Sequence, residues 1–173
     1  IWNKNLLYKG FKIVPYCPRC GTPLSAQEVA QGYKDVKERS AIARFKVKDE
    51  DAYILAWTTT PWTLPSNVAL CVNPEEQYVK VKAADGYTYY MAEALLDTVL
   101  GSLEREEGTP AYEVLETYVG KDLEYKEYEP LYNFKKLDKK AHYVVCDTYV
   151  TLTDGTGVVH IAPAFGEDDS KVG

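Results

Sequence analysis

The sequence is poor in the residues that covalent catalysis and metal binding usually require. Its 173 residues include two histidines, four cysteines and one methionine. It has no Gly-x-Ser-x-Gly elbow, no Gly-rich nucleotide-binding loop and no His-Glu-x-x-His pair. With only His142 and His160 present, a Ser–His or Cys–His nucleophile pair has few ways to form. The sequence therefore argues against covalent catalysis.

Long apolar runs and a basic charge excess are also missing. No stretch approaches the length of a membrane span, and no signal peptide opens the chain. The net charge is −6, whereas a protein that holds nucleic acid by itself normally shows a basic stripe. We therefore expect the isolated chain to bind RNA weakly. Because it starts at Ile1 without an initiator methionine, we expect it to be a piece of a longer protein.

Tyrosine, in contrast, is abundant. Fifteen tyrosines against four phenylalanines favour half-buried strand positions with the hydroxyl at the surface. Many short strands, two short helices and no βαβ alternation predict a mainly β (α+β), barrel-like fold. A length of 173 residues suits one domain with a real core, so we assign residues 1–173 to a single domain.

Periodicity and turn signals place the expected elements along the chain. A capping box at Ser25-Ala26-Gln27-Glu28 starts one short helix, and apolar spacing predicts another over 92–100 with Gly101 as its cap. The expected strands cover residues 40–47, 53–57, 68–72, 78–83, 87–91, 112–119, 158–161 and two runs within 141–152. Residues 120–132 carry alternating tyrosines and resemble a further paired-strand region, and residues 104–108 are expected to be a polar connection.

A cysteine knuckle occupies residues 15–24. Cys17 and Cys20 form a Cys-x-x-Cys followed by glycine, which lets backbone amides point at the sulfurs and supplies half of a tetrahedral zinc site. The other half is absent, so a partial zinc site and a metal-free turn both remain open. Cys71 and Cys146 lie singly in strand-like runs and read as ordinary buried cysteines.

Two longer motifs carry most of the functional information. Residues 153–169 read Thr-Asp-Gly-Thr-Gly-Val-Val-His-Ile-Ala-Pro-Ala-Phe-Gly-Glu-Asp-Asp, a glycine turn, a short strand with one imidazole, and three carboxylates. Residues 57–70 read Trp-Thr-Thr-Thr-Pro-Trp-Thr-Leu-Pro-Ser-Asn-Val-Ala-Leu, with four hydroxyls and two indoles but no charge. The first motif taken alone is also compatible with a hairpin followed by a solvated acidic loop.

Together, the two motifs resemble the editing domain of the isoleucyl-tRNA synthetase family, the connective-polypeptide insertion of a class I enzyme. The likeness extends from Pro15 to the C-terminus. Related leucine and valine enzymes carry arginine where this chain has Thr60, so Thr58-Thr59-Thr60-Pro61-Trp62-Thr63 favours the isoleucine enzyme. The signatures for amino-acid activation, His-Ile-Gly-His and Lys-Met-Ser-Lys-Ser, are absent, so the chain cannot charge tRNA.

The resemblance implies hydrolysis of valyl-tRNA(Ile), and possible action on valyl-adenylate, in the cytoplasm. It implies no cofactor for editing, a structural zinc only in the full-length enzyme, and ATP use only by the missing synthetic domain. Its partners would be the 3′ aminoacyl end of tRNA(Ile) and the rest of the synthetase in cis, with no membrane and a monomeric fragment. A second Cys-x-x-Cys beyond this domain would complete the zinc site.

The resemblance also assigns roles to individual residues. Asp169 would anchor the α-ammonium group, while Thr59 and Thr60 would hold the ester or its attacking water. Thr63, His160 and Trp62 would form the wall that excludes isoleucine. The remaining substrate-binding candidates are Thr58, Gly157, Ala162 and Asp168. Trp57 and His142 read instead as core residues.

Two alternatives remain open from the sequence. One is a non-catalytic tRNA-docking or zinc-knuckle module. The other is the equivalent editing domain of a valyl- or leucyl-tRNA synthetase, against which Thr60 and Trp62 argue. A valyl-adenosine analogue that binds in preference to its isoleucyl counterpart would separate an editing site from a docking module.

Overall fold

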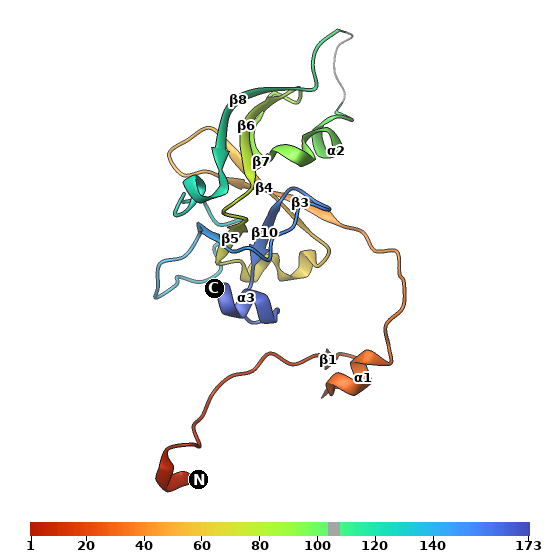
Figure 1. Ribbon diagram of the computed structural model, residues 1–173, viewed down its shortest axis with the longest axis vertical. Helices are drawn as coiled ribbons and strands as arrows, with labels where there is room; N and C mark the ends of the chain where they lie inside the picture. Colours follow the sequence, from red (N-terminus) through yellow and green to blue (C-terminus); the bar gives the residue numbers. More distant parts are fainter. Residues whose placement is uncertain (104–107) are drawn as a thin grey trace.

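One sheet dominates the computed structural model, which describes residues 1–103 and 108–173 (Figure 1). The strand order is β8-β6-β7-β4-β10-β5-β9, and β3 pairs with β4 off this path. The strands of this sheet are β3 (Ala41–Lys46), β4 (Tyr53–Thr58), β5 (Ala69–Val72), β6 (Gln77–Ala83), β7 (Thr88–Ala92), β8 (Tyr112–Val119), β9 (Tyr143–Cys146) and β10 (Val158–Ile161). The sheet curls into a half-barrel, which confirms the mainly β, barrel-like prediction.

The helices in the described residues are short, and η1 and α1 lie in the N-terminal arm, apart from the sheet (Figure 1). They comprise η1 (Trp2–Lys4), α1 (Ala26–Ala30), η2 (Pro61–Ser66), η3 (Glu93–Leu95), α2 (Leu96–Leu100), η4 (Gly120–Leu123) and α3 (Glu167–Val172). The capping box before α1 is confirmed, because the Ser25 hydroxyl accepts from the Glu28 amide while the Glu28 carboxylate accepts from the Ser25 amide. The polar connection expected at 104–108 lies almost wholly outside the described residues.

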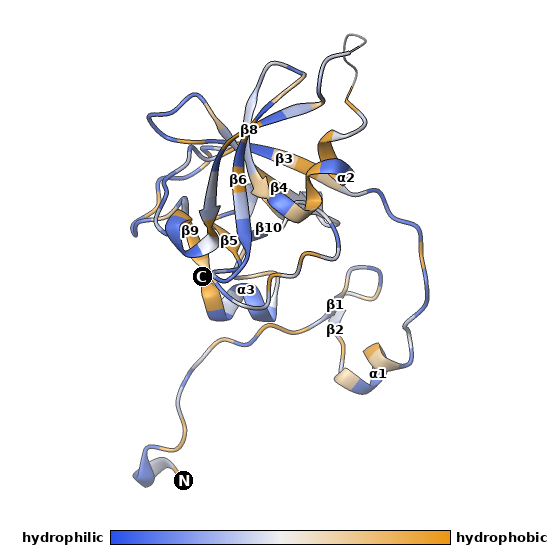
Figure 2. Cartoon of the chain, turned by 45° about the horizontal axis from the view of Figure 1, so that its top comes forward, coloured by the Kyte–Doolittle hydropathy of each residue, from blue (hydrophilic) through white to orange (hydrophobic). Residues whose placement is uncertain are grey.

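The N-terminal arm, residues 1–40, differs from the rest of the chain. It contains a two-stranded ribbon, β1 (Tyr16–Cys17) with β2 (Thr22–Pro23), and none of its residues is buried. Hydrophobic residues recur along the arm as orange segments in Figure 2. Trp2 and Phe11 of this arm are among the most exposed large hydrophobic residues of the described chain. The core therefore belongs to residues 41–173.

The main core lies against one side of the sheet and includes Phe45, Leu70, Tyr78 and Met91. Tyr78 is fully buried, and its hydroxyl donates to the Gly157 carbonyl at 2.6 Å while accepting from the Asn73 amide at 2.9 Å. A smaller cluster of Ala69, Cys71, Val150 and Ile161 packs against Val172 of α3. This second cluster holds α3 against the sheet.

Three expected elements were wrong in extent. The helix predicted over 92–100 begins later, because the Ala92 amide still donates to the Thr156 carbonyl at 2.9 Å and remains part of β7. Gly101 occupies the C-cap position but with a right-handed φ of −61°.

The tyrosine-rich segment 120–132 forms no regular strand. It opens with η4, and Tyr125 has a left-handed φ of 67°, which breaks an extended run. Only isolated bridges join it to the sheet, at Val47–Tyr128 and Glu127–Tyr143. In 141–152, only β9 is a strand, because the Tyr149 amide donates to the Asp147 carboxylate at 3.0 Å and turns the chain.

Strand β10 brings the two motifs together. It runs parallel to β4, with Val159 opposite Trp57, and antiparallel to β5, with His160 opposite Leu70. Since β10 lies between these two strands, the end of the threonine motif meets the histidine of the second motif across the sheet. The fold thus places both motifs at one site.

Candidate functional site

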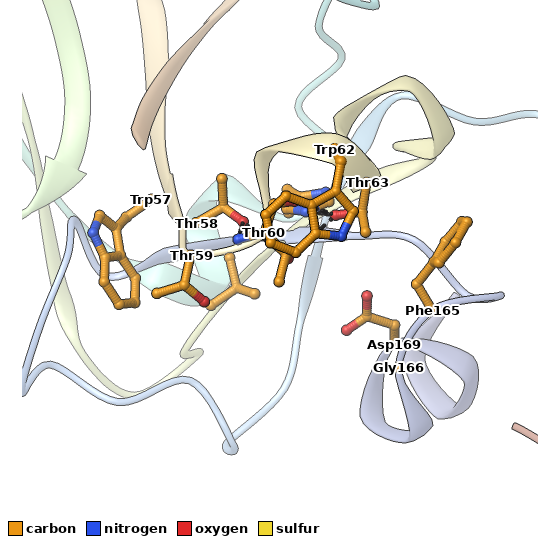
Figure 3. A pocket seen from close by; sticks show the side chains of 11 residues that line it. Trp57, Thr58, Thr59, Thr60, Trp62, Thr63, Phe165, Gly166 and Asp169 are labelled. Atoms are coloured by element: carbon orange, nitrogen blue, oxygen red, sulfur yellow. Dashed lines mark hydrogen bonds between the residues drawn. The ribbon is translucent and has the colours of Figure 1, made fainter. Parts of the chain in front are cut away.

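A pocket of about 360 Å³ lies where β4, η2, β10 and α3 meet (Figure 3). Its walls come from both sequence motifs: Trp57, Thr58, Thr59, Thr60, Trp62, Thr63, Val159, His160, Phe165, Gly166 and Asp169. One side consists of threonine hydroxyls at the end of β4 and the start of η2, hereafter the threonine wall (residues 57–63). The other consists of residues 165–169, hereafter the acid wall.

Internal hydrogen bonds fix the threonine wall. The Thr58 hydroxyl accepts from the Thr60 amide at 3.0 Å, and the Thr63 hydroxyl donates to the Thr60 carbonyl at 2.8 Å. The Thr60 hydroxyl lies 3.4 Å from both the Thr58 and Thr63 hydroxyls. Pro61 opens η2 with its fixed φ, so the chain turns directly from the strand into this helix. Thr58 and Thr63 are buried, and their orientations are therefore set by the fold.

The imidazole of His160 closes the back of this wall. Its Nε2 lies 2.9 Å from the Thr63 hydroxyl, whose single proton already goes to the Thr60 carbonyl. Nε2 must therefore carry a proton and donate it to Thr63, which leaves Nδ1 as a buried acceptor with no partner within the described residues. Burial lowers the pKa of His160, and the charge of Asp169 opposes this only in part. The ring is thus neutral at physiological pH.

The acid wall presents one carboxylate to the pocket. Asp169 lies in the first turn of α3, and its Oδ2 accepts from the Ala162 amide at 2.9 Å. Its Oδ1 has no hydrogen bond within the described residues. In Figure 3, the carboxylate lies across the pocket from Thr59, beside Phe165. Gly166 makes room for it, because a Cβ there would lie 3.0 Å from Asp169 Cγ and 3.1 Å from Oδ1.

This arrangement separates two kinds of recognition. A carboxylate with an uncommitted oxygen suits a cationic group such as a primary ammonium. The opposite wall offers hydroxyls, a neutral imidazole and apolar surface, which suit an ester and a small side chain. The Thr63 hydroxyl contacts the imidazole but gives its proton to the Thr60 carbonyl, so this pair offers orientation and polarisation rather than an activated nucleophile.

Comparison with known proteins identifies the family of the chain. Residues 1–153 match the family model of tRNA synthetases class I (I, L, M and V). The chain belongs to this family. It is 59% identical to the isoleucine–tRNA ligase of Clostridium kluyveri over 98% of its length, and 46% identical to that of Picrophilus torridus over 100%. It spans about 16% of the length of each of these relatives.

Solved structures of editing domains share the fold of this class I synthetase segment. The crystal structure of GlLeuRS-CP1 matches with a TM-score of 0.62 and 14% identity, covering 77% of this chain and 58% of that one. The P. knowlesi cytosolic leucyl-tRNA synthetase editing domain matches with a TM-score of 0.58 and 17% identity, covering 76% of this chain and 59% of that one. At these identities the likeness concerns the fold.

Most of the predicted site residues in this synthetase segment do meet. The pocket is lined by Thr58, Thr59, Thr60, Trp62, Thr63, His160 and Asp169. Ala162 lies behind the acid wall, where its amide holds Asp169. Asp168 does not line the pocket, and its carboxylate pairs with Lys171 at 3.2 Å. Gly157 does not reach the pocket; with a φ of 72° it packs under Ala92, where a Cβ would approach to 2.4 Å. Its need for glycine is therefore structural.

Sequence reasoning missed four lining residues. Trp57, read as core, forms part of the pocket wall, and its ring lies against Gly155, where a Cβ would be 2.9 Å from the ring atoms Cγ and Cδ2. Val159 lines the pocket because it lies opposite Trp57 in the pairing of β10 with β4. Phe165 and Gly166 directly precede the acidic residues, and Gly166 is the N-cap of α3, three residues before Asp169.

The cysteine knuckle contributes nothing to this pocket. The Cys20 amide donates to Cys17 Sγ at 3.3 Å, and the hydrogen bonds from Cys20 lower the pKa of the Cys17 thiol. Among the residues that the structure covers, no three His, Cys, Asp or Glu side chains gather to hold a metal ion. The knuckle thus supplies at most two ligands of a zinc site. Burial raises the pKa of Cys71 to about 12, as fits an inert core thiol.

Among the residues that the structure describes, no helix has the length and hydropathy needed to cross a bilayer.

Proposed function

We propose that this chain is the editing hydrolase of an isoleucine–tRNA ligase and cleaves the ester of mischarged valyl-tRNA(Ile). One observation carries the proposal: both motifs line a single pocket with hydroxyls on one wall and a carboxylate on the other. The relatives that are 59% and 46% identical to the chain are isoleucine–tRNA ligases, and the fold resembles that of a leucyl-tRNA synthetase editing domain. The same pocket would accept valyl-adenylate, which presents the same ammonium group and side chain.

In this proposal Asp169 binds the α-ammonium group through the uncommitted Oδ1. Its other oxygen stays on the Ala162 amide, which keeps the charge aimed into the pocket. The aminoacyl ester is intrinsically labile, so holding it beside a positioned water supplies much of the acceleration. Thr59 and Thr60 are placed to hold the ester or that water, and no covalent intermediate is required.

Selection against isoleucine rests on the size of the pocket. A methylene in an apolar pocket is worth only ~1–3 kcal/mol, and the double-sieve principle long established for synthetases answers this with a second, smaller site. Here Thr63 and His160 are locked together at 2.9 Å, so this part of the wall yields little to a larger side chain. Trp62 adds an exposed indole at the rim.

The test compares hydrolysis of valyl-tRNA(Ile) and isoleucyl-tRNA(Ile) by the chain. We expect clearance of the valyl ester at least ten times faster than that of the isoleucyl ester, on the basis of one methylene. Binding of non-hydrolysable valyl- and isoleucyl-adenosine analogues provides the control. Equal rates and equal binding of both analogues would rule out editing and leave the non-catalytic docking module.

A further inference from the structure

A basic and aromatic loop lies outside the pocket. Residues 131–140 carry four lysines against one aspartate, a net charge of +3 in a chain whose net charge is −6. All ten residues are exposed, so the loop contributes little to the core. It projects from the lower part of the body as the light-blue segment of Figure 1. A concentration of positive charge on an acidic protein requires its own explanation.

Two aromatic rings in this loop stack on each other in solvent. Tyr132 and Phe134 have centroids 5.3 Å apart and an interplanar angle of 13°. Tyr132 is 45% exposed and Phe134 77%. Exposed aromatic faces next to lysines are the combination that binds single-stranded nucleic acid, because every base has a face that can stack.

Three of the four lysines form no ion pair with another residue that the structure describes. Lys140 pairs with Glu127 at 2.7 Å and lies over the Tyr143 ring. Lys135, Lys136 and Lys139 form no ion pair within the described residues. Asp138 is the one acidic residue of the loop and cancels one of these charges at most. Unpaired lysines on a loop are available to phosphate groups.

The base of the loop is rigid and joins the end of η2. The Tyr128 amide donates to the His142 carbonyl at 3.0 Å, and the His142 amide donates to the Val68 carbonyl at 2.7 Å. The buried Tyr128 hydroxyl donates to Asn67, the C-cap of η2, at 2.6 Å. A hollow of about 220 Å³ lies between Pro65 and Asn67 on one side and Tyr132 and Phe134 on the other.

The loop is therefore tied to the far end of the helix whose first residues form the pocket. Thr60, Trp62 and Thr63 lie at the start of η2, and the loop is fixed after its last residue, Ser66. Six residues of 3₁₀-helix span about 12 Å. Three to four nucleotides cover this length at ~3.4 Å each.

We propose that the 131–140 loop binds the single-stranded RNA segment that leads to the ester-bearing 3′ end in the pocket. Lys135, Lys136 and Lys139 contact its phosphates, and Tyr132 and Phe134 stack on a base. The identity of this RNA as the end of a tRNA rests on the proposed function. The assignment of the surface to RNA rests on the loop itself.

Charge removal provides the first test. The probe is a fluorescein-labelled single-stranded RNA tetranucleotide, and anisotropy gives its dissociation constant between ~50 and ~200 mM salt. The triple variant K135Q/K136Q/K139Q should reduce the slope of log K against log salt by about 2, since each phosphate contact on a single strand contributes about 0.7. The control K9Q/K34Q/K37Q removes the same charge from exposed positions of the arm. Equal slopes in the two variants would overturn the proposal.

Removal of the rings provides the second test. Tyr132→Ala or Phe134→Ala should weaken binding of the same RNA by about ten-fold at constant salt, because a stacking partner is lost. Tyr33→Ala, which removes a ring that is 82% exposed in the arm, should not. A change in self-association without a change in RNA affinity would assign the loop to protein contacts and overturn the proposal.

A third measurement separates this proposal from the editing function. Valyl-adenosine carries the ester without the RNA chain, so the loop variants should hydrolyse it like the unmodified chain while KM for valyl-tRNA(Ile) rises. If the chain cleaves neither ester and the loop variants still weaken RNA binding, the RNA-binding role of the loop is supported and the editing function is refuted. If the loop variants cleave both esters normally and their KM for valyl-tRNA(Ile) is unchanged, the editing function is supported and the RNA-binding role of the loop is refuted.

Discussion

The two walls of the pocket are built in different ways. The threonine wall continues from β4 at the centre of the sheet, contains the buried Thr58 and Thr63, and is hydrogen-bonded to itself and to His160. The acid wall sits on a six-residue helix with no buried residue, and one backbone amide orients its carboxylate. The shape of the pocket is thus set by the rigid scaffold, and its charge by a small attachment.

The largest effect should come from removing that charge. Asp169→Ala should reduce hydrolysis of valyl-tRNA by about 100-fold, because losing one partner of a desolvated charge pair costs ~2–5 kcal/mol. Asp168→Ala removes a neighbouring carboxylate that pairs with Lys171, and should leave the rate unchanged. Single-turnover hydrolysis measures both. Full activity in Asp169→Ala would move the ammonium site away from the acid wall.

On the threonine wall, Thr63→Ala should lower stability and relax selectivity together. The variant leaves the buried Nε2–H of His160 without an acceptor, at a cost of about 1–2 kcal/mol in the free energy of unfolding. It also widens the pocket, so isoleucyl-tRNA should be hydrolysed. Thr63→Ser keeps the hydroxyl and should retain stability in urea unfolding. An equal loss of stability in Thr63→Ser would exclude this hydrogen bond as the cause.

A smaller effect should follow when the carboxylate is displaced rather than removed. In Gly166→Ala the new methyl would lie 3.0 Å from Asp169 Cγ, while φ at −146° suits any residue. We expect about a ten-fold lower rate with nearly unchanged stability, since small misplacements of a binding group reduce rate. Gly32→Ala, whose Cβ meets only ordinary contacts, is the matched control. A normal rate in Gly166→Ala would show that the acid wall tolerates movement.

The smallest expected effect is a pH dependence of the free energy of unfolding, to which His160 and Asp169 both contribute. Burial lowers the folded-state pKa of His160 below its ordinary 6.5, so the unfolded chain binds more protons as pH falls through that value. The free energy of unfolding should therefore decrease on acidification from about pH 6.5. Asp169 opposes this shift, so Asp169→Asn should steepen the decrease and His160→Gln should reduce it. Urea midpoints at pH 7.5 and 5.5 measure this; identical slopes in all three chains would contradict it.

The sequence was most informative where a pattern repeats locally. Alternation in Ala41, Ala43 and Phe45 predicted β3, and the capping box predicted α1, because neighbouring residues determine both. The tyrosines of 120–132 looked equally regular, yet the left-handed Tyr125 interrupts them. Their conformation depends on contacts with residues far along the chain, which a local pattern does not encode.

The residues of the candidate site also fall into those that a local motif predicts and those that only the tertiary structure reveals. Thr58, Thr60 and Thr63 could be predicted because one short motif holds them, and the likeness to a family linked them to His160 and Asp169. Gly157 was placed at the substrate because it belongs to that motif, although its contact with Ala92 gives it a different task. Trp57 was assigned to the core because indoles usually lie there. Only tertiary structure shows which face of such a residue meets a cavity.

The central position of β10 also determines when this sheet can close during synthesis. Thr63 and His160 are 97 residues apart in sequence, and β10 is made after every other strand that the structure describes in this sheet. At ~5–20 residues per second, the facing edges of β4 and β5 remain unpaired for several seconds after they are made. Open edges are where nascent chains join one another. The strand that completes the pocket therefore also ends the period in which the chain is most exposed to aggregation.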